Sequence, residues 1–89
     1  MNRFSLKVVT PAGVVLEKEV AGLYLRGCEG DLAVFAGHIP FVTAVKECKC
    51  TVVYGEDGEN GEDTEAEVGE GLLNVEAGGV TLLIQSWKA

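Results

Sequence analysis

The feature that most constrains the fold is an alternation of apolar and polar residues with a period of two, repeated in short segments along the chain. In the first segment, Phe4, Leu6 and Val8 alternate with Ser5 and Lys7. Because successive side chains of a β-strand point to opposite faces, this spacing predicts a strand with one face buried and the other in water. The same spacing recurs in later segments, and we find no convincing helical period.

Clusters of turn-forming residues separate these segments. Residues 10–13 read Thr-Pro-Ala-Gly, where proline presets one backbone dihedral and glycine permits a positive φ. Residues 27–31 and 77–79 form similar clusters. The pattern predicts about eight or nine short strands, the spacing typical of a β-sandwich or barrel. A chain of 89 residues is long enough for one domain and not two, so we predict one all-β domain over residues 1–89.

Three segments carry more specific expectations. Residues 14–20 predict a strand with Val14, Leu16 and Val20 on its apolar face. Residues 32–35 are continuously apolar, so we expect this strand to be covered on both faces. Residues 41–45 fit either a loop or a short strand.

An acidic segment, residues 55–63, lies between the alternating segments 48–54 and 64–68 and contains five acidic residues. We predict a hairpin with this segment at its tip. An EF-hand calcium loop starting at Glu56 would put Gly58 at a ligand position and would be flanked by strands instead of helices. A solvated hairpin tip is the better interpretation.

The charge balance excludes some partners. The formal net charge is −7, from 14 acidic and 7 basic residues. A nucleic-acid backbone and an anionic membrane surface both require clustered basic residues. No segment has the length of apolar residues that a membrane helix or a signal peptide needs. We therefore expect a cytoplasmic protein that associates with a membrane only through a partner.

The cysteines do not predict a site. Cys48 and Cys50 would share one face of a strand, a poor geometry for a disulfide between them. With Cys28 and His38 they suggest zinc, but Cys-x-Cys is not the usual ligand spacing and a second ligand pair is missing. We expect reduced thiols, no metal and no cofactor. His38 also has no titratable partner at a spacing that helps catalysis, so we expect no catalytic residues.

Three blocks of sequence carry a resemblance. The first, residues 6–15, is a strand, a Thr-Pro turn and a second strand. The second covers residues 27–34 and 37–46 and includes Gly-His-x-Pro. The third covers residues 69–75 and 80–83. In this order and spacing, the blocks resemble the epsilon subunit of F-type ATP synthases over nearly the whole chain.

The resemblance implies a two-sheet β-sandwich of about ten strands. It also implies a non-catalytic rotor subunit at the foot of the central stalk of a proton- or sodium-translocating ATP synthase. There the family's domain binds the gamma subunit and the ring of c subunits, at the cytoplasmic face of the bacterial cell membrane. Because the sequence ends at Ala89, we expect a subunit without the family's C-terminal helical hairpin, which carries autoinhibition and, in some members, nucleotide binding.

Five residues match the family's contact positions. The resemblance implies that Thr10, His38 and Thr43 contact the gamma subunit, and that Glu29 and Asp31 contact the c ring. Read without the resemblance, all five are ordinary turn, loop or strand residues.

Two other functions compete with this interpretation. A free-standing β-sandwich that binds a ligand or serves as an adaptor would have a concave pocket with convergent polar groups. A small metalloenzyme would contain zinc, and it is the weakest of the three.

Overall fold

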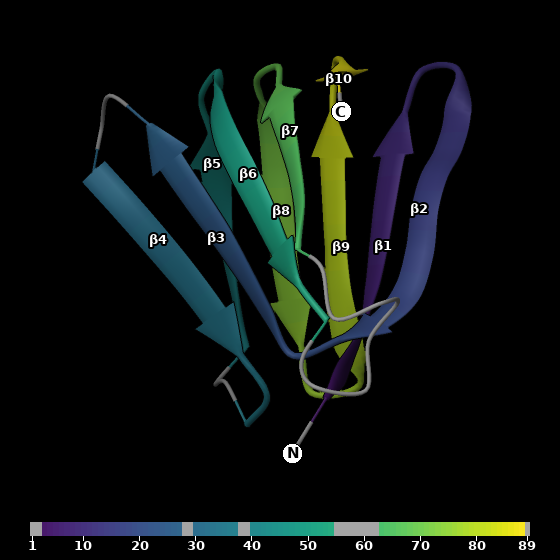
Figure 1. Cartoon of the computed structure of the whole chain (residues 1–89), viewed down its shortest axis with the longest axis vertical. Helices are drawn as coiled ribbons and strands as arrows, with labels where there is room; N and C mark the ends of the chain where they lie inside the picture. Colours follow the sequence, from purple (N-terminus) through teal and green to yellow (C-terminus); the bar gives the residue numbers. More distant parts are fainter. Residues whose placement is uncertain (1–2, 28–29, 38–39, 55–62, 89) are drawn as a thin grey trace.

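Strands form most of the described chain and pair into two five-stranded sheets (Figure 1). The computed structural model describes residues 3–27, 30–37, 40–54 and 63–88. The described strands are β1 (Phe4–Thr10), β2 (Gly13–Val20), β3 (Gly22–Gly27), β4 (Gly30–Phe35), β5 (Phe41–Val45), β6 (Cys48–Val53), β7 (Thr64–Val68), β8 (Gly71–Glu76), β9 (Gly79–Ile84) and β10 (Trp87–Lys88). The predicted two-sheet β-sandwich of about ten strands is confirmed.

We call the two layers sheet A, with the order β2-β1-β9-β8-β5, and sheet B, with the order β10-β7-β6-β3-β4. The pair β1–β9 is parallel, and the other paired strands of the described chain are antiparallel. In Figure 1, β4 and β5 lie along one side of the sandwich and β2 along the other. The turn between β1 and β2 lies at the same end as β10, and the N-terminus lies at the opposite end.

The core lies between the sheets and consists of alternate residues from nearly every strand. Leu6 and Leu82 from sheet A and Leu23 and Val52 from sheet B have no exposed surface. Removing one such side chain from water contributes roughly 1.5–3 kcal/mol to folding. This is the outcome that period-two alternation predicts, because one face of each strand is apolar.

The expectation that residues 32–35 are covered on both faces is wrong. β4 is the terminal strand of sheet B, and its inward side chains, Leu32 and Val34, are the ones that pack into the core. Phe35 points outward and is 47% exposed. Its ring meets Tyr24 edge to face, with the ring centroids 5.5 Å apart. The continuous apolar run therefore reflects an exposed aromatic residue on an edge strand.

The expected placement of Val14 is also wrong, because β2 contains a β-bulge. Val8 pairs with Leu16 but Val9 pairs with Val14, so Val15 is an extra residue in the ladder. The bulge reverses which face the following residues occupy. Leu16 packs against the core as predicted, whereas Val14 is 53% exposed.

The remaining local expectations are settled by strand pairing. Residues 41–45 form the edge strand β5 and not a loop. Strands β6 and β7 form the predicted antiparallel hairpin. Where β6 ends and β7 begins, the Tyr54 and Thr64 hydroxyls share a 2.9 Å hydrogen bond. Residues 55–62, the predicted acidic tip and most of the calcium interpretation, lie outside the described residues.

Candidate docking faces

A row of apolar residues crosses the outer face of sheet A, one residue from each strand. Each residue in the row pairs with the next: Ala44, Leu72, Leu83, Val9 and Val14. We call this set the apolar row. Leu72 and Leu83 are 40% and 42% exposed. Side chains of directly paired residues lie on the same face of a sheet, so the row forms one continuous apolar strip.

Polar residues border the strip. The neighbouring row begins at one apolar residue, Val42, which is 60% exposed, and continues through the polar residues Asn74, Thr81, Lys7 and Glu17. The Lys7 ammonium lies 3.9 Å from the Glu17 carboxylate. An apolar strip beside a polar row is the arrangement of a protein–protein contact surface.

The outer face of sheet B has the opposite chemistry. Its corresponding row contains only charged residues, each paired with the next: Asp31, Arg26, Lys49, Glu67 and Lys88. All five are exposed. We call this set the charged row.

The predicted gamma-contact residues lie at two points of sheet A. Thr10 ends β1, directly after Val9 of the apolar row. Its hydroxyl accepts a hydrogen bond from the Ala12 N–H (3.2 Å) and donates one to the Gly13 carbonyl (3.3 Å), so it shapes the turn. Thr43 lies in β5, which β9 and β8 separate from β1, and it pairs with buried Leu73. Its side chain therefore lies on the inner face of the sheet, at the open edge.

The predicted c-ring residue Asp31 lies in sheet B, at the end of the charged row on edge strand β4. The structure thus assigns Thr10 and Thr43 to one sheet and Asp31 to the other. His38 and Glu29, the other predicted contact residues, lie outside the described residues.

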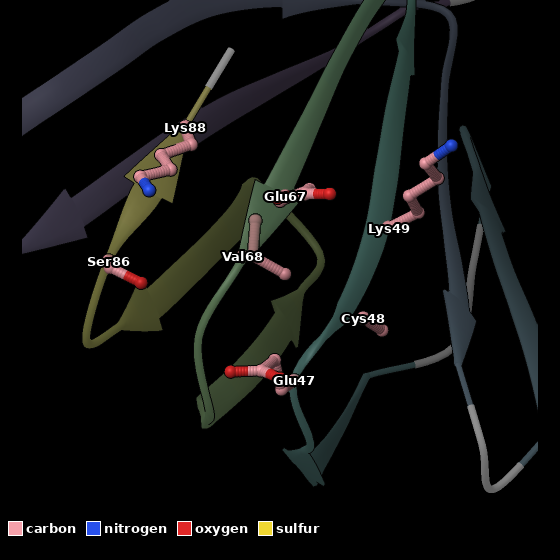
Figure 2. A pocket seen from close by; sticks show the side chains of 7 residues that line it. All are labelled: Glu47, Cys48, Lys49, Glu67, Val68, Ser86 and Lys88. Carbon is pink, nitrogen blue, oxygen red and sulfur yellow. The ribbon is translucent and has the colours of Figure 1, made fainter.

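A shallow pocket of about 430 Å³ lies beside β6, β7 and β10 (Figure 2). Its lining residues are Glu47, Cys48, Lys49, Glu67, Val68, Ser86 and Lys88. The volume suits a small ligand. Figure 2 shows the ammonium groups of Lys49 and Lys88 on opposite sides of Glu67, pointing apart. The polar groups of this pocket therefore do not converge on one point (Figure 2).

The cysteines of β6 behave as predicted from their spacing. Cys48 and Cys50 pair with Val68 and Ala66 and share the inner face. Burial raises the pKa of the Cys50 thiol to about 12, so this thiol is protonated at neutral pH. Within the described residues, no group of three or more His, Cys, Asp or Glu side chains is placed to hold a metal ion.

The apolar row was not predicted from the sequence, although the chain contains a signal for it. Strands with strict alternation have single apolar residues, but here apolar residues occur in adjacent pairs at 8–9, 72–73 and 82–83. In each pair one side chain enters the core and the other must point outward. Such pairs predict a sheet with two apolar faces.

The fold and these faces define the chain as a small two-sheet β-sandwich with an apolar row on one outer face and a charged row on the other. Among the described residues, no helix is long and apolar enough to span a membrane, and no charged side chain is buried. Residues 3–88 match the pattern of the family described as ATP synthase, Delta/Epsilon chain, beta-sandwich domain. The chain belongs to this family.

Similar proteins carry consistent names. The ATP synthase epsilon chain of Clostridium perfringens is 33% identical over 86 residues, which cover 97% of this chain and 62% of the relative. The epsilon chain of Thermodesulfovibrio yellowstonii is 47% identical over 45 residues, 51% of this chain and 32% of the relative. The chain therefore spans less than two thirds of the length of these relatives.

Solved structures share the fold. A chain from the mitochondrial ATP synthase of Euglena gracilis (OSCP, F1 and c ring) superposes with a TM-score of 0.80 and 22% identity, covering 96% of this chain and 52% of that one. A chain from the central stalk and c ring of the Tetrahymena thermophila enzyme superposes with a TM-score of 0.78 and 10% identity, covering 97% and 66%.

Proposed function

We propose that this chain is a non-catalytic central-stalk subunit of a rotary ATP synthase, and that it binds the gamma subunit and the c ring to couple ion flow to ATP synthesis. The observation that carries the proposal is the apolar row, because a small soluble domain exposes such a strip when a partner covers it. The relatives named ATP synthase epsilon chain support the choice of complex.

The gamma subunit occupies the outer face of sheet A in this proposal. The apolar row supplies the buried centre of the contact, and the row from Val42 to Glu17 supplies a polar rim. Thr10, at the end of β1, flanks the contact, and Thr43 joins it from the edge at β5. We propose His38 as a further gamma contact from the sequence resemblance alone.

The c ring meets the end of the molecule where β3 turns into β4. Asp31, the second residue of β4, is exposed there, and Glu29 directly precedes β4 in the sequence. An exposed carboxylate steers a transient contact with basic or amide groups on the ring. The coupling ion is a proton or a sodium ion; the relative from Propionigenium modestum, 42% identical over 59 residues (64% of this chain and 43% of the relative), is named as sodium ion specific.

The mechanical role follows from the fold. Two laddered sheets over a packed core transmit strain with little deformation, which suits a part that carries torque. The subunit sits at the cytoplasmic face of the bacterial cell membrane and is held there through the complex, with the chemistry of ATP synthesis left to other subunits.

A binding experiment with two matched variants tests the gamma face. Leu83→Lys places a charge in the apolar row, and Phe35→Lys makes the same kind of change at a similarly exposed position on sheet B. We expect Leu83→Lys to weaken binding to the cognate gamma subunit at least tenfold, about 1.4 kcal/mol. Phe35→Lys should bind the gamma subunit with nearly the same affinity as the unmodified chain. Equal losses for both variants, or no binding by the folded unmodified chain, would contradict the proposal.

A further inference from the structure

The four edges of the two sheets differ in how they resist pairing with another strand. Natural edge strands carry charges, bulges or a short length for this purpose. β2 has the bulge at Val15 and the charged residues Glu17 and Glu19. β10 has two residues, and β4 begins with Gly30 and Asp31.

β5 has none of these features. Its sequence, Phe-Val-Thr-Ala-Val, contains no charge, glycine or proline, and three of its five residues are β-branched. All five residues pair with β8 in an unbroken register. Among the described strands β8 alone pairs with β5, and the side chains of Val42 and Ala44 are exposed. In a regular edge strand, alternate N–H and C=O groups point away from the sheet.

The open edge is continuous with the apolar row. Ala44 is the end of that row, and Val42 lies two residues away on the same face. A strand added beside β5 would place its own outward side chains next to Val42 and Ala44 and lengthen the strip by one residue. The edge and the strip therefore form a single surface.

From this geometry we infer that the gamma subunit adds an extended segment along the outer edge of β5 at residues 42–45, making a six-stranded sheet A. The inference rests on the proposed function and specifies how the partner binds. The occupant is a β-strand whose alternate side chains are apolar, because backbone pairing requires an extended segment and the strip requires apolar neighbours. A second copy of this chain is the poorer occupant, because each copy carries a net charge of −7 and two copies would repel.

Amide hydrogen exchange measured residue by residue tests this on the unmodified chain, alone and with the cognate gamma subunit. We expect exchange at alternate amides of residues 42–45 to slow at least tenfold in the complex. Strand β2, at the opposite edge of sheet A, is the internal control, because it carries Val14 at the other end of the apolar row. If gamma contacts only the face of sheet A, amide exchange in β2 and β5 should slow alike. Strand addition should instead slow exchange at alternate amides of β5 only.

Three results would overturn strand addition. If gamma binds and the β5 amides exchange as before, or are slowed no more than those of β2, gamma contacts the face only and the proposed function stands. If the β5 amides become protected without gamma as the concentration of the chain rises, the occupant is a second copy. If gamma does not bind at all, both this inference and the proposed function fail.

Discussion

Leu82 and Leu83 are neighbours in the chain but have opposite surroundings. Leu82 has no exposed surface, and Leu83 forms part of the apolar row. Residue type does not explain this difference in exposure, because both residues are leucines on the same strand. The alternation of side-chain direction along β9 decides it.

The two leucines should respond very differently to truncation. Leu82→Ala leaves a cavity in a close-packed core and should lower the free energy of unfolding by about 2–5 kcal/mol. Leu83→Ala removes an exposed side chain and should change it by less than about 1 kcal/mol. Urea denaturation of both variants measures the difference. Equal destabilisation would show that the sheet faces have been assigned wrongly.

At the scale of elements, the unpredicted features all concern edges and close approaches between strands. The bulge in β2 turns Val14 outward, and the terminal position of β4 exposes Phe35. Gly71 shows a close approach inside sheet A, because an added Cβ would collide with the carbonyl oxygen of Leu83 on β9. The close contact explains why β8 begins with glycine at this point.

Replacement of two glycines tests that contact. Gly71→Ala forces β8 and β9 apart and should cost at least about 2 kcal/mol of unfolding free energy, as other overpacked sites do. Gly78→Ala is the matched control, because an added Cβ there meets nothing within 4 Å. It should leave stability within about 1 kcal/mol of the unmodified chain. Thermal denaturation compares them, and a Gly71→Ala variant as stable as Gly78→Ala would refute the proposed collision.

For the whole molecule, the separation of chemistry between the two outer faces matters most. Sheet A presents an apolar strip and sheet B a row of five charges. A subunit that must hold one partner firmly and touch another transiently can use the two kinds of surface for the two tasks. Of the predicted contact residues, Thr10 and Thr43 lie in sheet A and Asp31 lies in sheet B.

The charged face should respond to salt. Asp31→Asn should weaken binding of the chain–gamma complex to the isolated c ring about two- to fivefold at low salt, the range of one exposed ion pair. The loss should shrink at high salt, where the Debye length falls to a few ångströms. Asp63→Asn makes the same charge change at an exposed residue directly before β7, and it should have little effect on binding to the c ring. Titrations at two salt concentrations measure both variants, and a salt-independent loss for Asp31→Asn would contradict an electrostatic contact.

The alternation of apolar residues was sufficient to predict the all-β class, most strand positions and the inward residues, because side-chain direction along a strand is a local property. The shared face of Cys48 and Cys50 followed from the same rule. The family resemblance supplied the two-sheet arrangement and the five contact positions.

Sequence alone determined most of the segments that become strands and which of their side chains are apolar. The tertiary structure decided which strands lie at the edges, how the register shifts at Val15, and that Ala44, Leu72 and Val9 meet in one row. The physical reason is that pairing between strands is a non-local choice: residues far apart in the chain become neighbours only when the order of the sheet is set.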